Sequence, residues 1–255
     1  MSGGAYAPVG DARASSLSIV VPAFDEADNV VPAIQAISAV ARPLGRDYEI
    51  ILVNDGSRDA TGELARARLV GRIPGFVLIE HSPNRGYGGA LKAGFAVATK
   101  EVVAFTAADR QFDFREVTRL LDALTPDVAL VSGRRLDRRD RAMRRLNGMG
   151  WNLVVTALFG RSVSDIDCGF KVFRREVLDH IHIESDGAMV DTEMLAELRA
   201  RGYRLAEVPV THLARVAGSP TGAHPVVVVR AFRDLVRFRL RLSRELRAER
   251  AAAVR

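Results

Sequence analysis

The sequence predicts an α/β protein with a doubly wound, mostly parallel sheet flanked by helices. Short runs rich in Val and Ile alternate with longer segments of helical period, and the runs lack alternating apolar and polar residues. Strands of that kind are buried on both faces, as in parallel sheets whose crossovers are helices. A hydrophobic share of 48% among 255 residues is enough for a core and excludes a disordered or fibrous chain.

The predicted elements follow in strand–helix order. The expected strands are Leu17–Val21, Tyr48–Val53, Phe76–Glu80, Glu101–Phe105 and Val128–Val131. The expected crossover helices are Ala27–Val40, Asp59–Val70, Gly89–Ala98 and Asp113–Leu124. The last of these begins with Asp113 and Glu116 in a capping-box pattern. Beyond an arginine-dense segment, we expect an apolar helix ending at Phe159, a hairpin-like piece at Gly169–Phe173, a helix at Val190–Arg201 and a strand at Leu205–Val210.

Three regions are expected: a disordered lead-in at 1–16, the α/β domain at 17–222 and a basic amphipathic helical tail at 223–255. From Val226 onward there are nine arginines and three acids, a surplus equal to the net charge of +6 for the whole chain. Such a tail attracts anionic lipid headgroups and predicts peripheral membrane contact, although its apolar residues could equally pack on the domain. Because the rest of the charge is balanced, no nucleic-acid partner is predicted; binding through the tail is the alternative.

Cysteine content and the N-terminus bear on the compartment. Cys168 is the one cysteine, which excludes an intrachain disulfide. No secretory signal is visible, and the longest uncharged stretch, 146–160, is shorter than the roughly 20 residues of a spanning helix. The sequence therefore predicts a cytoplasmic protein, either soluble or peripheral on the cytoplasmic face of a membrane.

Polar residues follow three of the predicted strands. The strand ends read Pro22-Ala23-Phe24-Asp25-Glu26, Asn54-Asp55-Gly56-Ser57 and Ala107-Ala108-Asp109-Arg110-Gln111. Each alone could be a turn or a helix cap. Parallel strands end at one sheet edge, where doubly wound sheets bind ligands, so together they favour a binding site.

These motifs and their order resemble glycosyltransferase family 2, over about residues 17–222. Within the family, the resemblance is to the dolichyl-phosphate mannosyltransferase type, the polyprenyl-phosphate sugar synthases. The strand-end motifs are joined by Asn84-Arg85-Gly86, Gly88-Gly89-Ala90, Gly94-Phe95, Ser132-Gly133-Arg134, Asp165-Ile166-Asp167-Cys168-Gly169-Phe170, Glu207-Val208-Pro209-Val210 and Arg215-Val216-Ala217-Gly218-Ser219.

The resemblance implies a GT-A fold and inverting transfer of a hexosyl group from a nucleotide-sugar, with GDP-mannose as a candidate donor, to a polyprenyl phosphate. It implies Mg²⁺ or Mn²⁺ held by Asp109 and Gln111, whose oxygens suit a hard cation. It assigns nucleotide binding to Pro22, Ala23, Phe24, Glu26, Asp55, Lys92 and Ala108. Asp55 would contact the base, while Arg134 and Arg215 would hold phosphates.

The acceptor class can also be argued from charge. A phosphate monoester is already anionic at neutral pH, so it needs positive charge at the site more than a general base. Arg134 and Arg215 match basic motif positions, whereas the neighbouring arginines could equally form a solvated segment. For a sugar or glycan hydroxyl acceptor, Asp165 or Asp167 is the candidate base; otherwise either could orient an arginine.

Two features leave alternatives open. The family's acidic motif has a carboxylate where this chain has Ala107, which allows lower metal affinity or a nucleotide-binding, noncatalytic relative. The glycines at 86–94 could be read as a dinucleotide fingerprint, but they do not match its spacing and follow the third strand rather than the first. The sequence determines neither the sugar and base nor the oligomeric state.

Overall fold

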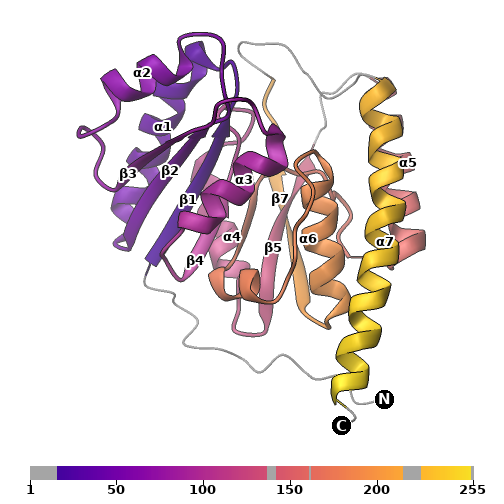
Figure 1. Cartoon of the computed structure of the whole chain (residues 1–255). Helices are drawn as coiled ribbons and strands as arrows, with labels where there is room; N and C mark the ends of the chain where they lie inside the picture. The colour runs from indigo at the N-terminus through magenta and orange to yellow at the C-terminus, as the bar shows by residue number, and fades with distance from the viewer. Residues whose placement is uncertain (1–15, 137–141, 161, 215–224, 254–255) are drawn as a thin grey trace.

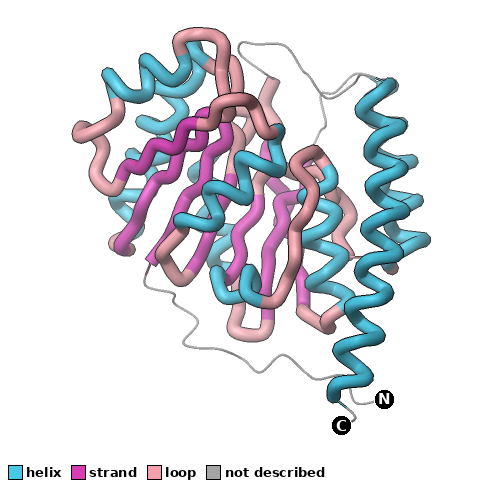
Figure 2. Tube along the Cα trace, viewed as in Figure 1, coloured by secondary structure: helices cyan, strands magenta, loops and turns pink. Residues whose placement is uncertain are grey.

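The fold is built on a seven-stranded sheet with strand order β3-β2-β1-β4-β6-β5-β7 (Figures 1 and 2). The computed structural model describes residues 16–136, 142–160, 162–214 and 225–253. Its strands are β1 Ser16–Ala23, β2 Asp47–Asn54, β3 Phe76–Glu80, β4 Val102–Phe105, β5 Val128–Leu136, β6 Lys171–Arg174 and β7 Arg204–Thr211. All neighbouring strands pair in parallel except β6, which is antiparallel to β4 and β5.

Helices cover both faces of this sheet. The helices are α1 Ala27–Ala41, α2 Thr61–Arg68, α3 Gly86–Val97, α4 Val117–Ala123, α5 Ala142–Phe159, α6 Met189–Ala200 and α7 Pro225–Ala253. Short 3₁₀ turns lie at Arg42–Leu44, Phe114–Glu116 and Arg175–Asp179. In Figure 1, α3 and α6 lie in front of the sheet and α1 and α4 behind it, while α7 runs along its outer side.

Successive strand residues enter two separate cores, which explains why the strands are apolar throughout. Ile50 and Leu52 pack with α1 and α4, whereas Ile51 and Val53 pack with α3 and α6 on the opposite face. All four are fully buried. Because side chains alternate across a strand, a sheet covered on both faces needs apolar residues at every position.

Most predicted elements are confirmed to within a few residues. The strand Phe76–Glu80 has the expected bounds, and the other predicted strands in the first half are present with small shifts at their ends. Asp113 caps the 3₁₀ turn before α4, accepting a hydrogen bond from the Arg115 N–H at 3.0 Å. The Glu116 carboxylate does not complete the predicted capping box, since it accepts the Thr211 N–H on β7 at 2.8 Å instead.

The prediction of a hairpin-like piece at Gly169–Phe173 is wrong. The segment contributes one strand, β6, which enters the centre of the sheet between β4 and β5. Its first residue, Lys171, is fully buried despite its charge.

The predicted regional boundaries are partly visible. Ser16 already pairs with Asp47 in β1, so the predicted lead-in is one residue too long at its end; residues 1–15 lie outside the described part. The predicted boundary between 222 and 223 also lies outside it, and α7 is described from Pro225 onward. Among the described residues, no helix combines the length and apolar character required to cross a bilayer.

Candidate active site

The predicted strand ends do meet at one edge of the sheet. Ala23 and Asn54 are register partners, and the Asp55 N–H donates to the Ala23 carbonyl at 2.9 Å. On the other side of β1, the Ala108 N–H donates to the Pro22 carbonyl at 3.4 Å. Three predicted nucleotide-binding residues, Pro22, Ala23 and Ala108, are therefore brought together with Asp55.

Asp55 anchors the turn that begins α3 at Gly86, called here the glycine turn. Its buried carboxylate accepts hydrogen bonds from the Arg85 N–H at 2.9 Å and the Gly86 N–H at 2.8 Å, and lies 2.6 Å from His81 Nδ1. Gly86 has φ of +85°, and a Cβ there would lie 2.4 Å from the Asp186 carbonyl oxygen, so the turn requires glycine. Contact between Asp55 and a base stays a prediction.

His81 was not among the predicted site residues. It directly follows β3, as Asp55 follows β2, so the strand-end rule applied to β3 would have found it.

The loops after β1 and β2 are tied to each other. Asp25, at φ of 54°, accepts the Arg58 N–H at 2.7 Å, while the Glu26 N–H donates to Thr61 Oγ1 at 2.8 Å. The buried Glu26 carboxylate also accepts from Asn29 at 2.6 Å, and Phe24 is half-buried beside these residues in the chain. These hydrogen bonds therefore fix the backbone of the loop that carries the predicted nucleotide-binding residues Phe24 and Glu26.

Asp109 lies in a tight turn after β4, called here the acidic turn. Its buried carboxylate accepts the Gln111 N–H at 3.1 Å, and Arg110 between them has φ of 59°, a left-handed value that is costly for a non-glycine residue. Gln111 is fastened to the segment after β7, because its Nε2 donates to the Leu213 carbonyl at 3.3 Å and its carbonyl accepts the Leu213 N–H at 2.8 Å. Strain of this kind is typical of functional turns.

Tyr87, which was not predicted, follows Gly86 in the glycine turn, and its side chain reaches the segment that contains Asp165 and Asp167. A Cβ at Gly169 would lie 3.6 Å from the Tyr87 hydroxyl. Burial raises the pKa of Tyr87 well above its ordinary value, and the neighbouring charges of Asp191, Asp109 and Asp167 add to the effect. The phenol is therefore neutral, and its hydroxyl lies near Gly169.

Asp165 orients an arginine, one of its two predicted roles. Its carboxylate accepts hydrogen bonds from Arg135 Nε at 2.8 Å and from Arg135 Nη2 at 2.7 Å, which makes a bidentate pair. Both side chains are largely buried. Burial opposes the charge of Arg135, but the pair with Asp165 outweighs it and raises the arginine pKa. The predicted phosphate-binding Arg134 is exposed next to it, and Arg215 lies outside the described residues.

Lys171 and Asp191 form a second pair, inside the fold, that the sequence did not predict. Lys171 Nζ donates to Asp191 Oδ1 at 2.5 Å and to the carbonyls of Ile166 and Cys168 at 3.1 and 2.5 Å. The lysine thereby holds the backbone of the motif around Asp165 and Asp167.

The Asp167 side chain keeps contact with solvent but lies close to the charged groups of Asp191, Arg135 and Lys171. Burial, followed by the negative charge of Asp191, raises its pKa to about 6, while Arg135 and Lys171 act in the opposite direction. Its ionised form therefore disfavours folding at neutral pH, and this cost declines as the pH falls from about 6 toward the ordinary value of 3.8, where the unfolded carboxyl also becomes protonated.

Asp167→Asn should therefore be more stable than the unmodified chain near neutral pH, because the variant carries no charge there. Thermal melts between about pH 7.5 and pH 5 should show this advantage shrinking on acidification, since Asp167 then becomes protonated. The exposed Asp122→Asn on α4 is the matched control. A difference that stays constant across the range would contradict the assignment.

Lys92 contacts the loop before α6. Its Nζ donates to the Glu184 carbonyl at 2.8 Å and pairs with Asp186 at 2.7 Å. It is thus placed on the helix that begins at the glycine turn, with its ammonium engaged by that loop; nucleotide contact stays a prediction.

A divalent cation fits the residues at the acidic turn. The described residues contain no group of three His, Cys, Asp or Glu side chains that could hold a metal by themselves. Asp109 would supply a carboxylate, and Gln111, whose Nε2 is used as a donor, would supply its amide oxygen. Mg²⁺ commonly takes only one or two protein ligands and completes its shell with phosphate and water, so this small set suits a cation–diphosphate complex.

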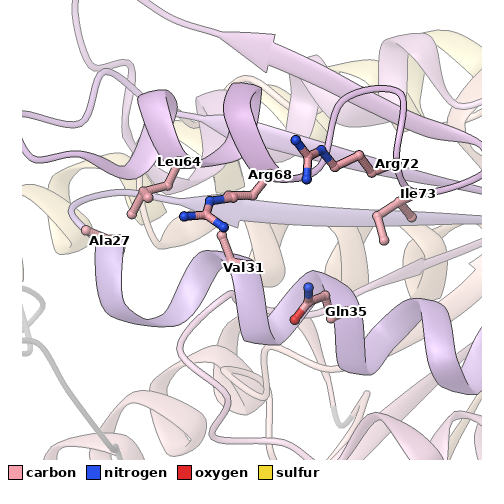
Figure 3. Close-up of a pocket in the computed structure, with 7 residues that line it drawn as sticks. All are labelled: Ala27, Val31, Gln35, Leu64, Arg68, Arg72 and Ile73. Carbon is pink, nitrogen blue, oxygen red and sulfur yellow. The ribbon is translucent and has the colours of Figure 1, made fainter.

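A pocket of about 440 Å³ lies apart from this site, between α1 and α2 (Figure 3). Its lining residues are Ala27, Val31, Gln35, Leu64, Arg68, Arg72 and Ile73. None is a predicted site residue, so the pocket is not the proposed nucleotide site.

Comparison with known proteins identifies the family. The profile described as "Glycosyl transferase family 2" matches residues 18–182. Undecaprenyl-phosphate 4-deoxy-4-formamido-L-arabinose transferase from Pseudomonas fluorescens is 30% identical over 220 residues, covering 86% of this chain and 64% of the relative. The protein of the same name from Edwardsiella ictaluri is 31% identical over 207 residues, covering 79% and 61%. The chain thus spans less than two thirds of the length of these relatives.

Solved structures show the same architecture. Glucosyl-3-phosphoglycerate synthase from Mycobacterium tuberculosis, in complex with Mn²⁺, UDP and phosphoglyceric acid, superposes with a TM-score of 0.71 at 21% identity, covering 88% of this chain and 78% of that one. Its complex with Mg²⁺ and UDP gives 0.69 at 20% identity, covering 88% and 79%. The predicted GT-A fold is confirmed, and the glycine turn follows β3, as the sequence argument against a dinucleotide fingerprint required. Together with the profile match over most of its length, these findings show that the chain belongs to glycosyl transferase family 2.

Proposed function

We propose that this chain is an inverting, divalent-cation-dependent glycosyltransferase that moves a sugar from a nucleotide donor to a polyprenyl phosphate. The observation that carries the proposal is the placement of the Asp109 turn beside the β1 and β2 strand ends, where Asp55 anchors the glycine turn of α3. That edge is where sheets of this topology bind nucleotides. The relatives named for undecaprenyl-phosphate transfer support the lipid acceptor.

In this proposal the strand ends hold the nucleotide and Asp109 with Gln111 holds the cation. Pro22, Ala23 and Ala108 present backbone and small side chains that let a base and ribose approach closely. A bound Mg²⁺ or Mn²⁺ supplies the charge that stabilises a departing nucleoside diphosphate. The neutral Tyr87 hydroxyl, near Gly169, can donate a hydrogen bond.

A phosphate acceptor fits the charges of the described site better than a sugar hydroxyl. Asp165 is engaged by Arg135 in a bidentate pair, so it is poorly suited to act as a base. A phosphate monoester needs no base, and the exposed Arg134 next to this pair can attract it. Arg215 is proposed to assist from the last motif. Asp167 is the candidate base for the alternative hydroxyl acceptor.

The donor sugar is proposed only as a class. The names of the relatives give 4-deoxy-4-formamido-L-arabinose rather than mannose, so the comparisons do not support GDP-mannose. A nucleotide-sugar is the donor class that the family and the acidic turn favour.

Membrane contact is proposed through the outer face of α7, at the cytoplasmic face of a membrane. Leu235, Phe238 and Leu242 are buried against the domain, so these apolar residues pack on the protein. The opposite face is exposed and mixes basic and apolar side chains: Arg233, Val236, Arg237, Leu240, Arg244 and Arg247. Exposed arginines near a membrane contribute about 1 kcal/mol each with anionic lipids.

The test is transfer of label from a panel of nucleotide-sugars, with Mn²⁺, to undecaprenyl phosphate in anionic vesicles. We expect labelled lipid with one donor, and protein that sediments with anionic but not with neutral vesicles. Label appearing only in soluble glycan acceptors would contradict the lipid acceptor. Failure to sediment with anionic vesicles would contradict the membrane contact.

A chain inactive with every donor would contradict the enzymatic proposal as a whole. In that case Ala107→Asp, which supplies the carboxylate that the family motif usually carries, separates the alternatives. Activity appearing only in this variant would identify a nucleotide-binding relative that has lost catalysis.

A further inference from the structure

The segment 182–187, called here the bridging loop, lies between the glycine turn of α3 and the C-terminal helix. On the α3 side, its Asp186 carbonyl accepts the Gly88 N–H at 2.9 Å and the Gly89 N–H at 3.3 Å. A Cβ at Gly88 would lie 2.3 Å from the Ser185 carbonyl oxygen, so the loop and the turn are in close backbone contact. Lys92 adds bonds to the same loop. The position of the glycine turn therefore depends on the position of the bridging loop.

On its other side, the bridging loop is held by α6 and α7. Glu193 on α6 accepts the N–H groups of Glu184 and Ser185, each at 2.9 Å. Glu197, one turn further along α6, accepts the His182 N–H at 2.9 Å. Arg241 on α7 donates to the His182 carbonyl at 2.8 Å and to Glu197 at 3.1 Å. Arg241 thus bonds directly both to the loop backbone and to the α6 carboxylate that holds it.

Besides forming these hydrogen bonds, Arg241 stabilises the negative charge of Glu193 and Glu197. Glu197 is fully buried and Glu193 is 4% exposed, and burial raises the pKa of both carboxyl groups. Arg241 opposes that effect at both residues, lying 3.1 Å from Glu197 and 3.9 Å from Glu193. Arg201 pairs with Glu197 but is not an ion-pair partner of Glu193. Without Arg241, less positive charge would offset the burial of the two carboxylates. Their hydrogen bonds to the bridging loop would then weaken.

We propose that Arg241 is a positioning residue for the nucleotide donor site, through which the docking of α7 sets the shape of the glycine turn. The connection runs from Arg241 through Glu197 and Glu193 to the bridging loop, and from the loop to the turn anchored by Asp55. It rests on the proposed function in that the turn is taken to border the donor nucleotide. Because coupling between sites is reciprocal, bound nucleotide must favour the docked α7 by the same factor that docked α7 favours nucleotide.

The test compares Arg241→Gln and Arg241→Lys with Arg250→Gln. Arg250 lies on the same helix, is exposed and is not among the residues proposed for membrane contact, so its replacement makes the same change in charge without touching the bridging loop. Hydrogen–deuterium exchange of the nucleotide-free protein should be faster in Arg241→Gln at residues 182–187 and also at 84–92. The lysine variant should lie in between, and Arg250→Gln should match the unmodified chain.

Binding of UDP and of GDP, each with Mn²⁺, is measured by calorimetry on the same proteins. For whichever nucleotide binds the unmodified chain, Arg241→Gln should raise Kd at least about fivefold, whereas Arg250→Gln should not change it. In the transfer assay, KM for the donor should rise while kcat changes little. The reason is that Arg241 touches neither the acidic turn, which is proposed to hold the cation, nor Arg134, which is proposed to attract the acceptor. Saturating nucleotide should slow exchange in α7 of the unmodified chain.

Specific outcomes overturn the inference. Faster exchange at 182–187 with no change at 84–92 would show that the loop does not transmit the docking of α7 to the turn. Exchange that accelerates everywhere would assign Arg241 to global stability instead. If neither nucleotide binds the unmodified chain, the proposed donor site fails, but the exchange experiment still decides whether Arg241 couples α7 to the turn.

Discussion

Asp109→Asn should reduce transfer by about 100-fold or more, because the variant removes the carboxylate proposed to hold the cation that stabilises the leaving diphosphate. Asparagine keeps an oxygen that can accept the Gln111 N–H, so the strained turn at Arg110 should persist and the fold should be unaffected. The measurement is the initial rate of labelled lipid formation at saturating Mn²⁺, with calorimetric titration of Mn²⁺ in the presence of nucleoside diphosphate.

The control for this variant is Asp122→Asn, which makes the same chemical change on the exposed surface of α4. It should leave the transfer rate unchanged. A rate for Asp109→Asn within a few fold of the unmodified chain would place the cation elsewhere and would remove Asp109 from the catalytic residues. Loss of activity together with loss of the thermal transition would instead indicate a structural role.

Lys171→Met should destabilise the fold by about 3–5 kcal/mol, the cost typical of leaving a buried charge without its partner. The substitution leaves Asp191 buried without its ammonium partner and removes the donor to the carbonyls of Ile166 and Cys168. Urea unfolding followed by circular dichroism gives the change in the free energy of unfolding.

Two further variants identify the cause. Lys100→Met removes a half-buried surface ammonium that pairs with the exposed Asp47 at 2.6 Å, and its unfolding midpoint should hardly move because water replaces the lost partner. Lys171→Met combined with Asp191→Leu should recover part of the loss, since no buried charge is then left unpaired. A double variant as unstable as the single one would assign the effect to the lost carbonyl contacts rather than to the charge.

The strand ends could be predicted because each depends on local pattern. A run of apolar residues identifies a buried strand, and the first polar residues after it mark the edge, as with Asp55 after β2 and Asp109 beyond β4. His81 follows β3 in the same way, so the same rule places it at this edge of the sheet. The rule that parallel strands end together then placed Pro22 and Ala108 beside Asp55.

The arginines show where local pattern fails. The predicted strand ended at Val131, but β5 continues to Leu136, so Arg134 and Arg135 alternate between its two sides. Arg135 turns toward Asp165, and Arg134 is exposed. With a strand that ends at Val131, periodicity does not indicate that Arg135, rather than Arg134, pairs with Asp165.

Taken without its fold, the amino-acid sequence accounts for the sheet, its covered faces and the family, because these depend on periodicity and on motifs read in order. The charge pairs depend on the packed structure: Lys171 with Asp191, Arg135 with Asp165 and Arg241 with Glu197 lie 20, 30 and 44 residues apart. The reason is physical, since a charge tolerates burial only beside its partner, and partners on different elements meet only after those elements have packed.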